Sequence, residues 1–386
     1  MSASNEPSEN KNSTSQLDVR KQHTPFIDAK SRKDKQSIEY ISKTLLAGGL
    51  AGCAAKTVIA PLDRVKILFQ TSNPAYEKFA GSFFGTFRAL STIRRTQGTF
   101  GLFQGHSATL LRIFPYAAIK FMSYEQLKGW LMPTKKHETP IKKFLAGSIA
   151  GCLSVFCSYP LDILRVRMAF DVRLNRPPSG LFETARAMYI EPSIFFPNAP
   201  KWILPFTNLF NFYRGFIPTI YGMIPYAGVS FLTYETLKSY MLMHYQQYTL
   251  SNWNEVSAYQ QQQSINPTSH PLTNISFTSA KSSDLHTPIK PILNALTNLT
   301  IGGISGVIAQ TFSYPFEVVR RHMQVSGKSA LGHEHTSTFN TVKDIFRRKG
   351  FRGFWIGLSI GYIKVTPMFA VSFYSYEWLK LQLNID

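Results

Sequence analysis

Hydrophobic segments separated by polar and basic connections occur three times along this chain, with two long segments in each occurrence. No segment contains an uninterrupted apolar run of roughly 20 residues, the length of a simple membrane-spanning helix. Helices that enclose a water-filled path can carry polar and charged residues on their inner face. The pattern therefore predicts an all-α membrane protein with six transmembrane helices and a short helix in each connection.

The three occurrences are copies of one sequence unit, and internal repeats of this kind indicate a repeated structural unit. The predicted repeats span 40–133, 140–243 and 291–386, and small-residue clusters in their first halves predict close helix packing. The first halves read 47-AGGLAGCAAKTVIAPLDRVKILFQ-70, 146-AGSIAGCLSVFCSYPLDILRVRMA-169 and 301-IGGISGVIAQTFSYPFEVVRRHMQ-324. The second halves read 112-RIFPYAAIKFMSYEQLK-128, 222-GMIPYAGVSFLTYETLK-238 and 364-KVTPMFAVSFYSYEWLK-380.

Three further segments interrupt or precede the repeats. The second repeat is longer than the others, and its extra residues form a Pro- and Phe-rich insertion at about 192–208. The Gln-, Ser- and Asn-rich stretch 244–290 predicts a disordered polar linker. Residues 1–39 predict a disordered tail that lacks the apolar core of a signal peptide, and its acidic residues do not suit a transit peptide.

Composition and charge narrow the class of protein. The 386 residues include 42 Lys and Arg against 22 Asp and Glu, a net charge of +20, yet only 17% are charged. An average soluble domain has roughly 25% charged residues, so an ordinary soluble enzyme is disfavoured. The basic residues are scattered between hydrophobic segments, which favours an anionic membrane surface or substrate over nucleic acid. The three Cys lie within apolar segments and do not suggest a disulfide framework.

Each first half contains the pattern Pro-x-acid-x-x-base, which places an acid and a base on one side of a helix that Pro kinks. A single such pair is more often a solvated ion pair within one helix. Three copies favour a ring in which the acid of one repeat faces the base of the next. The predicted first ring consists of the pairs Asp63–Arg165, Asp162–Arg320 and Glu317–Lys66.

Each second half contains Tyr-Glu-x-x-Lys, which predicts another ring at the opposite end of the helices. Two rings of modest salt bridges suit a bistable element, because one ring can break while the other forms. The predicted second ring consists of the pairs Glu125–Lys238, Glu235–Lys380 and Glu377–Lys128.

These motifs, with Phe103-Gln104-Gly105, Tyr213-Arg214-Gly215 and Trp355-Ile356-Gly357 between them, strongly resemble the mitochondrial carrier family over residues 40 to 383. The resemblance implies a monomeric six-helix transporter of the mitochondrial inner membrane, with both termini on the intermembrane side. It implies that the first ring is the matrix gate and the second ring the cytoplasmic gate. Gln70 and Gln324 resemble the family's braces beneath the matrix gate, whereas Ala169 leaves the third brace missing. Membrane lipid, in particular cardiolipin, is an expected partner, and no cofactor, metal or nucleic acid is expected.

A substrate without three-fold symmetry must be recognised by positions that differ between repeats. Lys56, Arg112 and Lys364 place three positive charges at such positions near mid-membrane, with Lys120 two turns beyond Arg112. Any one of them could extend towards a lipid headgroup, but bases far from helix ends usually mark a substrate path. The cluster predicts a site for phosphate groups, for which Arg offers a bidentate fork.

Gly222 stands where the other two repeats have Arg112 and Lys364. A missing side chain, the soft apolar Met223 and the ring of Tyr226 together predict a slot for adenine. Packing required by symmetry is the alternative, since Tyr116 matches Tyr226 by position. In the carrier family, Gly followed by an aliphatic residue here is associated with adenine-containing substrates.

Within the family, 222-GMIPYAGVSFLTYETLK-238 and 112-RIFPYAAIKFMSYE-125 look most like the coenzyme A carrier group of fungal type. An ADP/ATP exchanger would be expected to show Arg-Arg-Arg-Met-Met-Met after the third Pro, where this chain reads 320-RRHMQV-325. The predicted substrate is coenzyme A or a close adenine nucleotide derivative, and a carrier of ADP/ATP is the alternative. A receptor or scaffold is disfavoured by two complete rings, and an enzyme by the lack of a clustered catalytic constellation.

Overall fold

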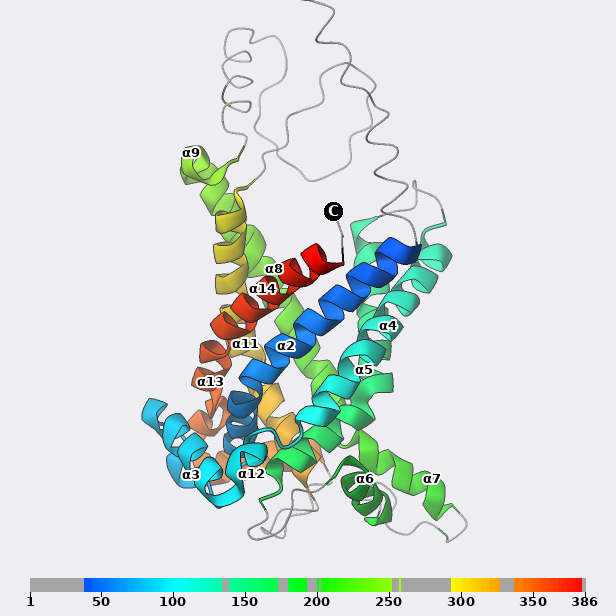
Figure 1. Ribbon diagram of the computed structural model, residues 1–386, viewed down its shortest axis with the longest axis vertical. Coiled ribbons are helices and arrows are strands. Elements are labelled where there is room, and N and C mark those ends of the chain that lie inside the picture. Colours follow the sequence, from blue (N-terminus) through cyan, green and yellow to red (C-terminus); the bar gives the residue numbers. More distant parts are fainter. Residues whose placement is uncertain are drawn as a thin grey trace, which may run out of the picture. The chain divides into compact units, whose positions relative to one another are not determined.

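A computed structural model describes residues 38–133, 139–172, 180–192, 200, 203–251, 257, 293–326 and 337–383 (Figure 1). The chain divides into two units, Met1–Ile59 with Thr366–Asp386, and Ala60–Val365. Nearly all of the predicted tail, most of the predicted linker and part of the predicted insertion at 192–208 lie outside the described residues.

The first half of each repeat forms one long helix with a Pro inside it. The α5 helix begins where the Thr139 side chain accepts a hydrogen bond from the Lys142 N–H, and Pro140 occupies the first turn, where its missing N–H costs nothing. Pro61, Pro160 and Pro315 each remove one backbone hydrogen bond and introduce a kink. The three helices are α2 (Ile38–Gln70), α5 (Pro140–Phe170) and α11 (Ala295–Val325).

The second half of each repeat is also helical, but the third copy is interrupted. The first two copies are α4 (His106–Leu131) and α8 (Phe216–His244). The third consists of α13 (Leu358–Ile363) and α14 (Val365–Gln382), with Lys364 between them. Pro367 offers no N–H to the carbonyl of Ile363, which weakens the helix at this point. The equivalent Pro115 and Pro225 lie within continuous helices, so the proline alone does not explain the break.

Four helical segments are long and apolar enough to cross a membrane: Ser42–Gln70, Ile141–Phe170, Pro205–His244 and Phe351–Gln382. The other two long helices, α4 and α11, are more polar, although their 26 and 31 residues would span about 39 and 46 Å. The hydrocarbon core of a bilayer is about 30 Å thick, so both are long enough to cross it.

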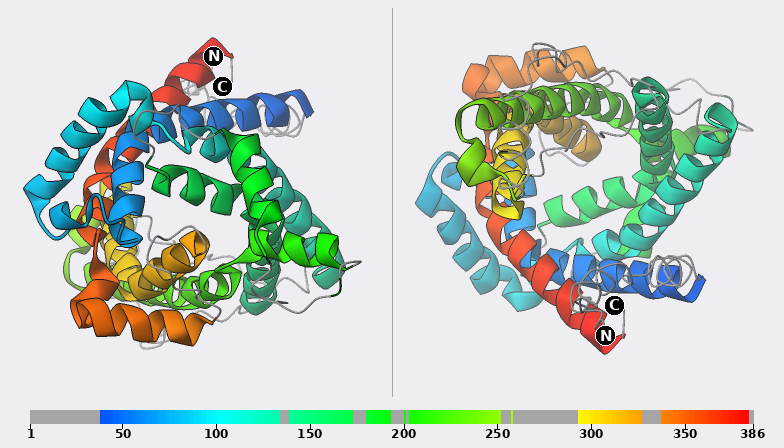
Figure 2. Two further views of the ribbon diagram at one scale, coloured as in Figure 1. Left: turned by 90° about the horizontal axis from the view of Figure 1, so that it is seen from below. Right: turned by 90° about the horizontal axis from the view of Figure 1, so that it is seen from above.

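Short helices connect the two halves of each repeat. Figure 2 shows, from below, α3, α6 and α12 placed around the ends of the Pro-containing helices within Ala60–Val365. The connecting helices are η1 (Glu77–Phe79) and α3 (Phe83–Leu102), then α6 (Leu181–Ile190), α7 (Leu204–Leu209) and η3 (Phe210–Tyr213), then α12 (Thr338–Lys349) and η4 (Phe351–Trp355).

The buried core of this unit repeats the three-fold pattern. The end of each Pro-containing helix packs on the short helix of its own repeat, as Leu68 does on Ile93, Ile163 on Met188 and Val318 on Ile345. A fourth cluster joins all three repeats where the helices end, with Ile67, Val166, Ala169, Phe170 and Val325. This apolar cluster holds the C-terminal ends of α2, α5 and α11 together.

Helices α4 and α5 pack side by side, as do α8 and α11 (Figure 1). Among the buried small residues of α5, Ala146, Ala150 and Ser154 are inaccessible to solvent. The predicted small-residue clusters include Gly147 and Gly151 in α5 and Gly302 and Gly306 in α11. The prediction of close contacts was wrong for Gly147, Gly302 and Gly306, because a Cβ added there would have no neighbour within 4 Å, whereas one on Gly151 would lie 3.8 Å from Met223. The buried face of each helix lies one residue away from these three glycines.

The start of the predicted linker is ordered. The short helix α9 (Gln246–Thr249) follows α8, and Leu250 pairs with Leu293 in an antiparallel bridge. The Asn294 N–H donates to the Thr249 carbonyl at 2.7 Å. The two ends of the inserted segment are therefore held together beside α8 and α11.

Candidate functional site

The three pairs predicted for the first ring are all present within Ala60–Val365. Each joins an acid and a base from different repeats, so the ring ties the three repeats together. The distances are 2.6 Å for Arg165 Nη2 to Asp63 Oδ2, 2.5 Å for Arg320 Nη2 to Asp162 Oδ2, and 2.9 Å for Lys66 Nζ to Glu317 Oε1.

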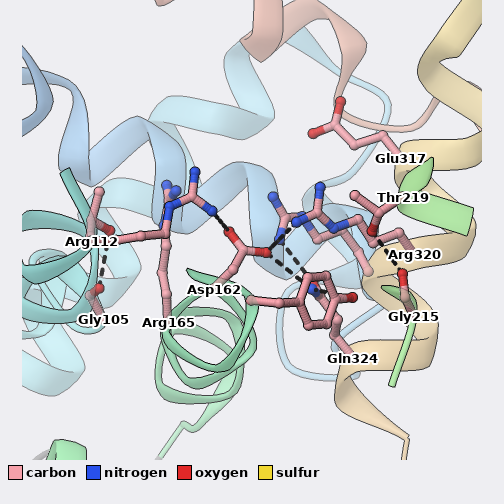
Figure 3. Close-up of polar contacts among 12 residues, drawn as sticks. Gly105, Arg112, Asp162, Arg165, Gly215, Thr219, Glu317, Arg320 and Gln324 are labelled. Carbon is pink, nitrogen blue, oxygen red and sulfur yellow. Dashed lines mark hydrogen bonds and ion pairs between the residues drawn. The ribbon is translucent and has the colours of Figure 1, made fainter. Parts of the chain in front are cut away.

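Two of the cations predicted to bind substrate lie directly on this ring. Arg112 Nη1 is 2.6 Å from Asp162 Oδ1, and Lys364 Nζ is 2.8 Å from Asp63 Oδ1. Figure 3 shows Arg112 and Arg320 reaching the Asp162 carboxylate, which also accepts a hydrogen bond from Gln324 at 3.1 Å. The sequence did not single out Arg321, whose Nη1 is 3.5 Å from Asp162 Oδ2. Its only sequence signal is the doubled base in 320-RR.

The third acid is arranged differently. Gly222 occupies the position equivalent to Arg112 and Lys364 and has no side chain to offer, so Lys66 is the one ion-pair partner of Glu317 among the described residues. The Glu317 side chain is 27% exposed, against 3% for Asp162. Each repeat thus contributes one acid and one base to the ring, but the acid of the third repeat lacks a second paired cation in the described part of the chain and is more exposed to solvent.

The two predicted braces each contain a tyrosine that the sequence analysis missed. Gln70 Nε2 donates to Tyr314 Oη at 3.0 Å, and that hydroxyl donates to the Ile356 carbonyl at 3.0 Å. Gln324 Nε2 donates to Tyr159 Oη at 3.1 Å, and that hydroxyl donates to the Arg214 carbonyl at 2.9 Å. The signal was in the sequence, because Tyr precedes the motif Pro in the second and third repeats.

The first repeat has Ala60 where the others have this tyrosine, and Ala169 where the others have the brace glutamine. Both members of the third brace are therefore missing. A small hollow that is open to solvent lies there and is lined by Ala60, Ala169, Gln104, His106 and Arg165, among others. Gln104 Nε2 is buried and has no hydrogen-bond partner among the described residues. The interface between the first and second repeats thus lacks the brace hydrogen bonds that the other two interfaces have.

Restoring this brace with Ala60→Tyr and Ala169→Gln is expected to stabilise the closed ring. One or two new hydrogen bonds contribute about 1–2 kcal/mol, a rise in unfolding temperature of about 2–8 °C, and uptake should become several-fold slower. Unfolding can be followed with a fluorogenic thiol reagent in a Cys157→Ala background, because Cys157 is already exposed whereas Cys53 and Cys152 are half-buried. The control, Ala60→Phe with Ala169→Leu, fills the hollow without hydrogen bonds. Equal unfolding temperatures and rates for the two double variants would show that no brace had formed.

Glycines begin the second helix of each repeat and bring it close to the ring. Gly105 and Gly215 have φ of 85° and 80°, a conformation that glycine adopts without strain. A Cβ on Gly105 would lie 2.6 Å from the Arg165 carbonyl oxygen, and one on Gly215 would lie 3.0 Å from that of Arg320. These turns therefore hold α4 and α8 against the backbone of the neighbouring repeat.

Two buried arginines outside the predicted site join neighbouring repeats. Arg64 Nε donates to the Ala169 carbonyl at 3.3 Å, and Arg167 Nη2 donates to the Ser326 carbonyl at 2.9 Å. Arg167 also pairs with Glu191 at 2.5 Å. Carbonyls at helix C-termini favour cations, so each arginine holds the end of the next Pro-containing helix. They occupy different positions in their repeats, which is why the search for symmetric motifs did not find them.

The other predicted substrate-binding residues are Lys56, Lys120, Met223 and Tyr226. Lys56, in the unit Met1–Ile59 with Thr366–Asp386, lies with its Nζ 3.5 Å from Met368 Sδ. Lys120 is exposed on α4. Met223 lies beside Gly151, with its Cε 3.8 Å from where a Cβ on that glycine would be, and Tyr226 is exposed. Neither side chain is seen to bound a closed slot.

Of the three pairs predicted for the second ring, Glu125–Lys238 lies within Ala60–Val365, and this pair is not formed. Glu125 is exposed and forms no ion pair with the other described residues of Ala60–Val365, including Lys238. The pairs Glu235–Lys380 and Glu377–Lys128 each join the two units and stay predictions. A closed first ring with no closed Glu125–Lys238 pair is the combination expected when the two rings alternate.

The family model described as mitochondrial carrier protein matches residues 39–135, 136–245 and 292–385. The chain belongs to the mitochondrial carrier family. The predicted three-repeat carrier fold is thereby confirmed.

Relatives match over nearly the whole chain. Mitochondrial carrier protein LEU5 of Saccharomyces cerevisiae is 43% identical over 367 residues, which cover 92% of this chain and 94% of that protein. Solute carrier family 25 member 16 of Homo sapiens is 37% identical over 348 residues, 90% of each chain. Mitochondrial carrier protein CoAc2 of Zea mays is 32% identical over 366 residues, 93% of each chain. This chain is therefore a transporter of the mitochondrial inner membrane and not an enzyme.

Proposed function

We propose that this carrier moves coenzyme A, or a closely related adenine nucleotide, by alternating access. The observation that carries the proposal is the unequal distribution of additional cations around the first ring. Arg112 and Lys364 each contact one of the acids, whereas Gly222, at the equivalent position, provides no cation for the third. Such a surface suits a substrate with phosphate groups at one side and a neutral flat group at the other. The name of the maize relative CoAc2 supports the same choice.

The cations couple substrate binding to the matrix gate, which is our assignment for the first ring. Phosphate oxygens compete with the Asp162 and Asp63 carboxylates for Arg112 and Lys364. Withdrawal of these cations leaves each acid with fewer partners, so the closed ring becomes less stable relative to the open one. A ligand shifts an equilibrium only by such a difference between states. We assign the second ring as the cytoplasmic gate that closes in turn.

Two further features of the proposal concern the surroundings. The net charge of +20 supports binding of an anionic lipid, for which cardiolipin is our candidate. We propose a monomer as the transporting unit, because three repeats within one chain complete the first ring without a second copy.

The test is uptake of labelled coenzyme A into liposomes that hold the purified protein. The liposomes are preloaded in turn with coenzyme A, adenosine 3′,5′-bisphosphate, ADP, ATP or nothing. We expect coenzyme A to compete best with the labelled substrate, and the most effective internal nucleotide identifies the exchanged partner. Transport of ADP and ATP alone would overturn the coenzyme A assignment in favour of an adenine nucleotide carrier.

A further inference from the structure

The sector of the first ring at Glu317 combines an accessible acid with an apolar ring. A Cβ on Gly222 would lie 3.0 Å from the Phe316 Cβ, so this glycine allows α8 to approach Phe316 on α11. The Phe316 side chain is 38% exposed, and it directly precedes Glu317 in sequence. Phe316 therefore occupies the position that a side chain at residue 222 would take, and its exposed part offers an apolar surface on the same helix as the Glu317 carboxylate.

One oxygen of that carboxylate is available to a ligand. Lys66 Nζ contacts Glu317 Oε1 at 2.9 Å, and no hydrogen bond or ion pair involves Oε2 in the part of the chain that the structure describes. Figure 3 shows the Glu317 carboxylate apart from the cluster around Asp162, with no contact drawn between them. The other two acids use both oxygens, Asp162 with Arg112 and Arg320, and Asp63 with Lys364 and Arg165.

An ionised carboxylate accepts hydrogen bonds and donates none. A ligand group at this sector therefore needs an N–H donor, together with a flat surface that can lie against Phe316. We infer that Glu317, through Oε2, is a specificity-determining residue that accepts a hydrogen bond from the exocyclic amine of the substrate's base while Phe316 contacts the ring. This inference rests on the proposed function and adds to it a reason for choosing a 6-aminopurine over a 6-oxopurine.

The test compares two competitors whose bases differ in the 6-substituent and in the neighbouring N1, which carries a hydrogen only in the 6-oxopurine. Adenosine 3′,5′-bisphosphate and inosine 3′,5′-bisphosphate are titrated against uptake of labelled coenzyme A. The unsubstituted protein is expected to require about tenfold or more of the inosine compound for half-inhibition. Its 6-oxo group places an acceptor against the carboxylate, and its N1–H lies one ring position away from where the amine donates. In the Glu317→Gln variant the amide can present either its oxygen or its NH₂ group, so the ratio should fall to about one.

Loss of transport in Glu317→Gln would not prevent the comparison. Binding is then measured as the rise in unfolding temperature that each bisphosphate causes in the detergent-solubilised protein. A ratio near one in the unsubstituted protein, or a ratio unchanged by Glu317→Gln, would overturn the inference. Absence of coenzyme A uptake before any competitor is added would instead overturn the proposed function, and the Glu317 role with it. Phe316→Leu serves as a control that should weaken both competitors alike.

Discussion

Arg112→Ala is expected to reduce uptake of coenzyme A by about 10- to 100-fold, because one charge-assisted hydrogen bond to a phosphate contributes about 1.5–3 kcal/mol. The guanidinium lies 2.6 Å from Asp162, so it can exchange that carboxylate for a substrate phosphate without a large movement. Its carbon Cζ is 5.6 Å from the centre of the Tyr116 ring, which helps to orient it. The measurement is the initial rate of uptake into proteoliposomes.

The fold should survive this substitution. Asp162 keeps Arg320, Arg321 and Gln324 as partners, so its charge stays compensated. Arg112→Lys should retain part of the activity, because it keeps the charge but not the bidentate fork. Arg88→Ala, on the exposed face of α3, is the matched control and should transport normally. Unchanged uptake by Arg112→Ala would remove this residue from the substrate site and would count against the competition between phosphate and Asp162.

Much of the fold and the whole first ring could be predicted from sequence. Because the motif occurs in three symmetric copies, the acid of one repeat is expected to face the base of the next. This is how Asp63 was matched with Arg165. This step required no knowledge of side-chain positions, because the symmetry of the repeats supplied the partner. Gln70 and Gln324 were instead predicted as braces from the resemblance to the carrier family.

Features that break the symmetry were harder to predict. Arg64 and Arg167 perform similar roles from different positions in their repeats, so comparison of the repeats does not align them. Arg112 was predicted to bind substrate, but its contact with Asp162 depends on how far a long side chain reaches across a helix interface. Gly222 was predicted to leave an adenine slot, and the sequence could not show that Phe316 lies against it.

Asp162→Asn is expected to destabilise the protein more than the matched change Glu317→Gln. Asp162 is the meeting point of Arg112, Arg320 and Arg321, and its side chain is only 3% exposed. Removal of one partner from a buried ion pair typically costs about 3–5 kcal/mol, because the remaining charge is left without compensation. Here three guanidinium groups would face a neutral amide.

Glu317→Gln leaves one cation, Lys66, beside a side chain that is already 27% exposed to solvent. Both substitutions preserve the shape of the side chain, so the comparison isolates the charge. Unfolding temperatures measured in the same detergent, with thiol exposure as the signal, should therefore fall in the order Asp162→Asn below Glu317→Gln below the unsubstituted protein. Equal decreases in unfolding temperature for the two variants would mean that the two acids contribute equally to stability. The three cations around Asp162 would then not make it the residue that contributes most to the stability of the closed ring.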